Sequence, residues 1–160
     1  MNNPYPTFIL VMRHGEKPGD GSDPNLAPAG VLRAQRLDTY IPQTFGKPDT
    51  IIAAADSPES SRPRETVEPL AAACGLVVQT PFADKQFAEL AIALRTQAGY
   101  RDKQIVVCWH HGEIPKLMKA LGCKEGDYPD PWDPIVFNLI LKATFAADGK
   151  ANVAQISEPF

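Results

Sequence analysis

All three histidines of the 160-residue chain come after short apolar runs. His14 follows the run Thr7–Met12 with one arginine between them, and His110 and His111 follow Gln104–Trp109. Short runs of this kind, rich in β-branched residues, are typical of strands that are buried on both faces of a sheet. In open α/β sheets, ligands bind just past the carboxyl ends of the strands. The three imidazoles are therefore predicted to lie at one ligand-binding edge.

The first histidine belongs to the sequence Arg-His-Gly-Glu at residues 13–16. A neutral imidazole can attack phosphorus and form a covalent intermediate. One ring nitrogen must then be free, while the other is held by an acceptor such as a backbone carbonyl. The planar guanidinium of Arg13 suits phosphoryl oxygens, and Gly15 is expected to let the chain turn sharply and a ligand approach the backbone. We therefore predict a phosphate site in which His14 is the nucleophile.

A second arginine stands where a helix is predicted to begin, in Arg-Pro-Arg-Glu-Thr at residues 62–66. Proline suits the first helical position, so Arg62 would lie at the helix N-terminus, where free N–H groups and the helix dipole favour an anion. Arg62 is predicted to clamp the phosphoryl group, and Arg64 is expected to face solvent. His110, once protonated, would stabilise charge on the transferring oxygens.

The elements that must position these residues alternate along the chain. Helix starts are predicted at Pro28, Pro63 and Pro115, with Pro42 ending the first helix and Asp84 capping another one. Asp148-Gly149 indicates a hairpin turn. The predicted strands are residues 7–12, 50–55, 76–80, 104–109, 135–145 and 151–156. This order predicts an α/β fold: a three-layer αβα sandwich whose mostly parallel central sheet has an antiparallel C-terminal edge.

Length and composition narrow the class of protein. A chain of 160 residues suits a single domain, residues 1–160. Its net charge of −3, with both signs scattered, does not indicate nucleic-acid binding or a polybasic membrane patch. No apolar run could span a membrane and no signal peptide is expected. The three cysteines, Cys74, Cys108 and Cys123, suit reduced thiols in a cytoplasmic protein. No oligomeric state is predicted.

These motifs together resemble the histidine phosphatase superfamily, in its compact, phosphoglycerate mutase-like branch. The resemblance includes residues 13–16, Arg62 with Thr66 four residues later, and His110 with Ile114 four residues later. It extends from Phe8 to about Leu121. It implies that His14 is the phosphorylated histidine and that Arg13, Arg62 and His110 complete the phosphate pocket.

The chain departs from the family's pattern at two points. His111 stands where the family usually has Gly or Ser, and a place in the pocket is open for His111 and for Glu16. The acid that protonates the leaving group has no clear counterpart. Asp84 lies in the right interval but suits a helix cap, and Glu113 lies near His110 but suits the start of the next helix.

The favoured function is a metal-independent phosphatase that needs no cofactor and acts on a phosphate monoester or a phosphoprotein through a phosphohistidine. The long insertions of phosphoglycerate mutases are missing, which favours hydrolysis over mutase-like phosphotransfer. The unplaced acid leaves open a catalytically weak, phosphate-binding regulatory module. A zinc site of the three histidines with Cys108 or an acid is disfavoured, because the neighbouring arginines would repel a cation and no HxH or CxxC pair is present.

Overall fold

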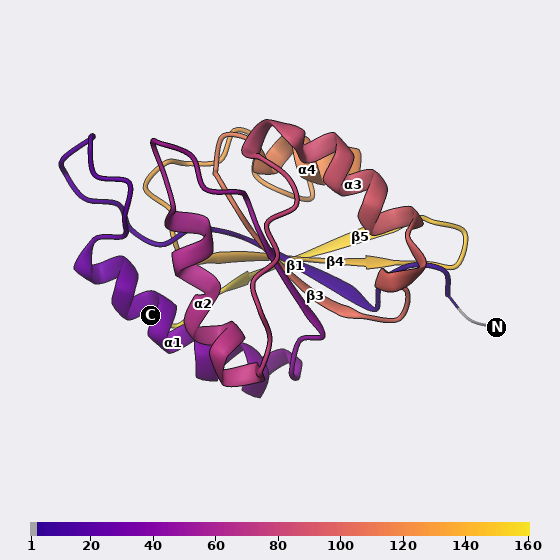
Figure 1. The fold of residues 1–160 in the computed structure, drawn as a ribbon. Coiled ribbons are helices and arrows are strands. Elements are labelled where there is room, and N and C mark those ends of the chain that lie inside the picture. Colours follow the sequence, from indigo (N-terminus) through magenta and orange to yellow (C-terminus); the bar gives the residue numbers. More distant parts are fainter. Residues whose placement is uncertain (1–2) are drawn as a thin grey trace.

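The computed structural model of the chain describes residues 3–160 and is built on a five-stranded sheet in the order β2-β3-β1-β4-β5 (Figure 1). β1 and β2 both pair with β3 in parallel, whereas β4 runs antiparallel to β1 and to β5. The predicted α/β sandwich, with a parallel core and an antiparallel C-terminal edge, is confirmed. The strands are β1 (Phe8–Arg13), β2 (Thr50–Ala53), β3 (Gln104–Trp109), β4 (Leu139–Phe145) and β5 (Ala151–Ser157).

Helices cover both faces of the sheet (Figure 1). On one face, α1 (Pro28–Phe45) and α2 (Arg62–Cys74) pack over Leu10 and Met12 of β1. On the other, α3 (Phe87–Thr96) and α4 (Ile114–Ala120) pack over Ile9 and Val11. Because successive strand side chains point to opposite faces, the apolar run of β1 supplies both cores.

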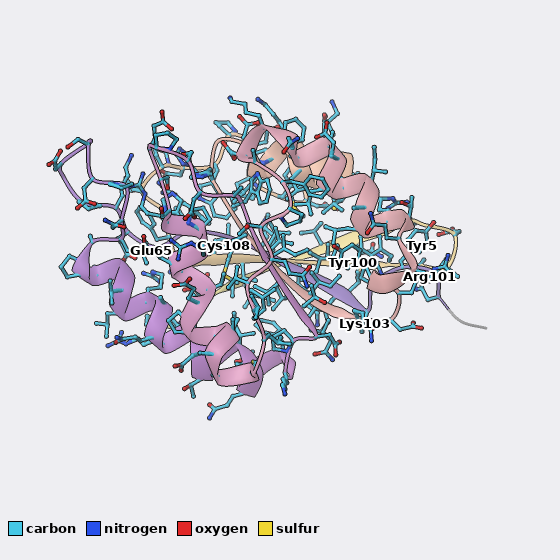
Figure 2. All side chains as sticks on the ribbon, viewed as in Figure 1. Tyr5, Glu65, Tyr100, Arg101, Lys103 and Cys108 are labelled. Carbon is cyan, nitrogen blue, oxygen red and sulfur yellow. The ribbon has the colours of Figure 1, made fainter. Side chains whose placement is uncertain are left out.

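The register of β1 against β3 sets the position of the candidate site. The six residues of β1 are all buried, and they pair with β3 from Phe8 opposite Gln104 to Arg13 opposite Trp109. Figure 2 shows Tyr5 and Lys103 near one end of the sheet and Cys108 toward the other. The two strands therefore end side by side, so the residues that follow them start from the same edge.

Several sequence-based boundaries are wrong. α1 continues through Pro42 to Phe45, because Ile41 is fully buried and the Phe45 ring packs 6.3 Å from that of Phe8. This packing offsets the backbone hydrogen bond that proline cannot make. β4 begins at Leu139 and not at residue 135, and β2 ends at Ala53.

Residues 76–80 do not form the predicted strand. They make a single parallel bridge, between Gln79 and Ile52 at the edge of β2, and Val77 is 83% exposed. The apolar pattern was therefore not a sign of burial. Asp84 does not cap α3 either, since it opens a 3₁₀ turn, Asp84–Gln86, that precedes the helix.

The three cysteines, Cys74, Cys108 and Cys123, are buried and unpaired, as expected of reduced thiols. Within residues 3–160, no helix combines the length and the apolar character that crossing a membrane requires.

The glycine of the Arg-His-Gly-Glu sequence lies in a tight backbone contact with α1. Gly15 does not have a positive φ, so no left-handed conformation requires a glycine here. A Cβ on Gly15 would lie 3.0 Å from the Cα of Gly30 in α1, and a Cβ on Gly30 would lie 2.5 Å from the carbonyl oxygen of Glu16. The two glycines let the loop after β1 and the first turn of α1 meet backbone to backbone.

We expect Gly30→Ala to destabilise the protein by about 1–3 kcal/mol, the usual cost of overpacking, because the new methyl group meets backbone atoms that cannot rotate away. Denaturant unfolding measures the change. Gly19→Ala is the matched control, since a Cβ at Gly19 has no neighbour within 4 Å. Equal stability of the two variants would contradict this account of the contact.

Candidate functional site

One ring nitrogen of His14 forms a hydrogen bond with the backbone, and the other has no hydrogen-bond partner within residues 3–160. Its Nδ1 lies 2.7 Å from the carbonyl oxygen of Gly15 and must donate to it, which leaves the lone pair on Nε2. The residue is 3% exposed. Burial, with a further contribution from the charge of Arg13, lowers the pKa of His14 to about 3, although the bond to Gly15 opposes the shift. The imidazole is therefore neutral at pH 7, as a nucleophile must be.

His110 lies directly beside His14. The ring centroids are 5.3 Å apart with the planes at 72°, and the His14 backbone N–H donates to the carbonyl of Trp109 at 3.2 Å. Burial, and then the charge of Arg62, lower the pKa of His110 to about 4. His110 is thus neutral in the free protein, so the protonated form expected from the sequence requires a bound anion.

His111 is half-buried, like His110. Burial lowers the pKa of His111, and the charges of Arg13 and Lys17 add to the effect. His111 therefore lies in the same positive surroundings as His14 and His110.

Arg13 is the most tightly enclosed charge of the site, at 2% exposed. Its Nη1 donates to the carbonyl of Pro134 at 2.6 Å, and its guanidinium carbon lies 3.9 Å from the centroid of the Phe137 ring. Burial, and then repulsion from Arg62, lower the pKa of Arg13 to about 10, so it stays charged at pH 7.

Arg62 is the first residue of α2, and its Nη1 donates to the carbonyl of Asp23 at 2.8 Å. Within residues 3–160, the buried Nε atoms of Arg13 and Arg62 have no hydrogen-bond partner. Two close cations with unused N–H groups favour an anion between them. Arg64 is held elsewhere, in surface ion pairs with Asp56 at 2.9 Å and Glu68 at 2.6 Å.

Thr66 joins the loop after β1 to α2. It is fully buried, and its hydroxyl accepts from the backbone N–H of Gly15 at 2.9 Å and donates to the carbonyl of Arg62 at 2.7 Å. The sequence signalled Thr66 only through its spacing from Arg62. This hydroxyl keeps the helix that carries Arg62 in place beside His14.

Glu16 is engaged with α1. Both of its oxygens accept from Arg33, at 2.9 and 3.1 Å, and Arg33 also binds Glu158 at 2.8 Å. Burial opposes ionisation of Glu16, but these bonds outweigh it and lower its pKa. Glu16 therefore supports the loop after β1 and affects Arg13 only through space.

Asp84 and Glu113, the two candidates for the general acid, have pKa values shifted in opposite directions. Burial would raise the pKa of Glu113, but ion pairs with Lys85 at 3.1 Å and Lys116 at 3.2 Å outweigh it and lower the pKa. For Asp84, burial and then the neighbouring charge of Glu113 raise the pKa to about 6. Its buried Oδ1 has no partner within residues 3–160. Of these two carboxyl groups, Asp84 is the one whose pKa is raised toward neutral pH.

Phe137 and the Pro134 carbonyl are contacts of the site that no sequence motif signals. Both come from the segment between α4 and β4. The sequence does not signal that this segment packs against the end of β1, because that contact depends on the path of the chain between α4 and β4.

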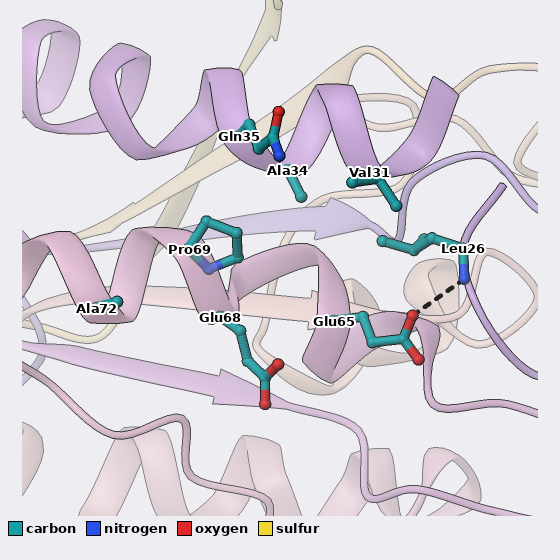
Figure 3. A pocket seen from close by; sticks show the side chains of 8 residues that line it. All are labelled: Leu26, Val31, Ala34, Gln35, Glu65, Glu68, Pro69 and Ala72. Carbon is teal, nitrogen blue, oxygen red and sulfur yellow. Dashed lines mark hydrogen bonds between the residues drawn. The ribbon is translucent and has the colours of Figure 1, made fainter. Parts of the chain in front are cut away.

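A groove of about 400 Å³ lies apart from the histidines, between α1 and α2 (Figure 3). At its rim, Glu65 accepts from the backbone N–H of Leu26 at 3.0 Å. This bond secures the end of the loop whose Asp23 carbonyl holds Arg62. The groove is lined by Leu26, Val31, Ala34, Gln35, Glu65, Glu68, Pro69 and Ala72.

Among residues 3–160, no three His, Cys, Asp or Glu side chains converge as a metal ion would require.

The sequence matches no model of a protein family and no curated protein. Its fold, however, is similar to those of solved structures. The protein histidine phosphatase SixA, complexed with tungstate, is 18% identical with a TM-score of 0.65, and the match covers 94% of this chain and 96% of that one.

Two further structures match over most of their length. A mycobacterial glucosyl-3-phosphoglycerate phosphatase with inorganic phosphate is 14% identical, with a TM-score of 0.62 and coverage of 96% and 97%. A phosphoglycerate mutase from Plasmodium falciparum is 14% identical, with a TM-score of 0.64 and coverage of 93% and 89%. The chain therefore has the fold of the histidine phosphatase superfamily.

Proposed function

We propose that this chain is a metal-independent histidine phosphatase that hydrolyses a phosphate monoester or a phosphorylated protein side chain through a phosphohistidine on His14. The observation that carries the proposal is the state of His14: buried, neutral, with Nδ1 held by the Gly15 carbonyl and Nε2 free. The proximity of Arg13, Arg62 and His110 to His14 supports a phosphate pocket at this place.

In the first step, Nε2 of His14 attacks phosphorus as the bond from phosphorus to the leaving oxygen breaks. Arg13 and Arg62 would bind the phosphoryl oxygens through Nη2, which makes no hydrogen bond within residues 3–160 in either arginine. A bound dianion raises the pKa of His110, so this imidazole gains a proton and donates a hydrogen bond to the transferring group. In the second step, water attacks phosphorus and gives a proton back to the acid that protonated the leaving oxygen, the N–P bond breaks, and neutral His14 is restored with inorganic phosphate.

We propose Asp84 as the acid that protonates the leaving oxygen. Its raised pKa supports this role, because a general acid must hold its proton near the working pH. Glu113 is ionised by its two lysines and instead raises the pKa of Asp84.

The neighbours support a phosphorylated substrate. One is a protein histidine phosphatase and another a phosphatase of glucosyl-3-phosphoglycerate. The match covers 89% of the mutase chain, so length does not separate hydrolysis from phosphotransfer. Transfer of the phosphoryl group to water or to an added alcohol is the measurement that does. The three unpaired cysteines support a reducing compartment such as the cytoplasm.

His14→Ala is expected to abolish release of phosphate from an activated aryl phosphate, by roughly 10³-fold or more, because the covalent step is lost. The assay contains chelator, and a thermal melt checks that the variant is folded. Turnover by wild type alone supports the proposal. Wild type that binds vanadate without turnover would favour the regulatory module, and unchanged activity of His14→Ala would exclude this nucleophile.

Arg62→Ala is expected to weaken inhibition by vanadate by about 1.5–3 kcal/mol, or roughly 10- to 150-fold, the contribution of a hydrogen bond to a charged group. Arg64→Ala is the matched control, since its ion pairs lie on the surface. A larger effect at Arg64 would mean that the wrong arginine has been assigned.

Asp84 should produce a pH dependence that appears only with poor leaving groups. As pH rises through about 6, Asp84 loses its proton, so kcat/KM for an alkyl phosphate should fall relative to that for an activated aryl phosphate. Both rates are referred to the concentration of the substrate dianion, because aryl and alkyl phosphates have different second pKa values. Asp84→Asn should remove the fall, and Glu113→Gln should move it to lower pH because a neighbouring negative charge is gone. A fall that persists in Asp84→Asn would rule out this acid.

A further inference from the structure

We infer that Phe137 is a positioning residue for Arg13: its ring face and the Pro134 carbonyl set the orientation in which the guanidinium meets a phosphoryl group. The inference rests on the proposed function and adds a residue from a segment without any motif.

The contact between Phe137 and Arg13 is close and buried. The guanidinium carbon lies 3.9 Å from the ring centroid, the shortest cation–aromatic distance within residues 3–160, where the arginine–aromatic pairs outside the site have distances of 5.0–5.7 Å. A cation within about 6 Å of a ring face is attracted to it, more strongly when water is excluded. Arg13 is 2% exposed, so its contact is of the stronger kind.

Contact with a ring face does not consume N–H donors. The Pro134 carbonyl takes one donor of Arg13, at Nη1, whereas Nη2 makes no hydrogen bond within residues 3–160 and is not among the buried unpartnered atoms. The Phe137 ring contacts one face of the guanidinium and the Pro134 carbonyl binds one edge. These two contacts define its orientation and leave N–H donors for a ligand. Arg13 thereby loses less side-chain entropy when an anion binds than an unrestrained arginine would.

The segment that carries these two groups, residues 132–137, is itself well anchored. The Trp132 side chain is 3% exposed, and its Nε1 donates to the Val136 carbonyl at 3.0 Å. Asp133 accepts from the backbone N–H of Ile135 at 3.1 Å through its side chain and from that of Val136 at 3.0 Å through its carbonyl. The indole packs in the core under α3 and α4, so the position of Phe137 is tied to the core.

Phe137 also lies against the nucleophile. Its ring centroid is 6.4 Å from that of His14, with the planes at 52°. One apolar side chain thus adjoins both the attacking imidazole and the arginine that would receive the phosphoryl oxygens.

The test compares Phe137→Leu, which keeps an apolar side chain without a π-face, with Phe137→Tyr, which keeps the ring. The dissociation constant of inorganic phosphate should rise about 3- to 30-fold in Phe137→Leu, in line with a desolvated cation–π contact, and return to within about twofold in Phe137→Tyr. Phe45→Leu is the control. Phe45 is also half-buried and lies 5.8 Å from the Lys142 ammonium, but it sits beside Phe8, at the opposite end of β1. The inference would be overturned if Phe137→Leu and Phe137→Tyr weakened phosphate binding equally, or if Phe137→Leu did not weaken it.

Two further measurements separate positioning from general packing. In an Arg13→Gln background, Phe137→Leu should no longer weaken phosphate binding, because the residue through which it acts is gone. The NMR signals of the Arg13 guanidinium should be shifted by the ring current in wild type and should lose that shift in Phe137→Leu. The inference would be refuted if Phe137→Leu weakened phosphate binding equally in the Arg13→Gln background, or if Phe137→Leu left the Arg13 NMR signals unchanged. The NMR measurement needs no ligand. It therefore tests the contact between Phe137 and Arg13 even if the wild-type protein binds no phosphate and the proposed function is wrong.

Discussion

The in-register parallel pairing of β1 with β3 is the constraint on which the site depends. Six residues of each strand pair in order, from Phe8 opposite Gln104 to Arg13 opposite Trp109. A shift by one residue would send every side chain of β1 into the opposite core and change the packing of both. The fit of these side chains in their two cores therefore favours one register, and that register brings His14 and His110 together at 5.3 Å.

The positive charges near the carboxyl ends of β1 and β3 are not neutralised by carboxylates among the described residues. Arg13, Arg62 and two neutral histidines lie together, while the nearest carboxylates are already bound, Glu16 to Arg33 and Glu113 to two lysines. Placing Arg13 and Arg62 together without a carboxylate partner among residues 3–160 opposes folding. Natural proteins accept such costs chiefly at functional sites, and an anion that enters between the arginines would remove this one.

The loop after β1 is held from several directions by contacts that never touch a ligand. Gly30 lets α1 approach the backbone of Glu16, and the Thr66 hydroxyl ties Gly15 to α2. Backbone carbonyls of Asp23 and Pro134 hold one arginine each. Because each of these bonds comes from a different element, His14 and its neighbours are arranged before any ligand arrives, which reduces the cost of binding.

The sequence by itself determined the features that depend on local chemistry. Apolar runs marked β1 and β3, and prolines marked the starts of three helices, because a first-turn proline loses no hydrogen bond. The histidines at the strand ends and Arg62 at a helix start followed from these. Only the tertiary structure decided that α1 passes through Pro42, that residues 76–80 stay outside the sheet, and that Asp84 is half-buried beside Glu113. It alone brought Phe137 onto Arg13, 124 positions away in the sequence. These outcomes depend on packing between distant segments, which competes with local preference and leaves no mark in the pattern of neighbouring residues.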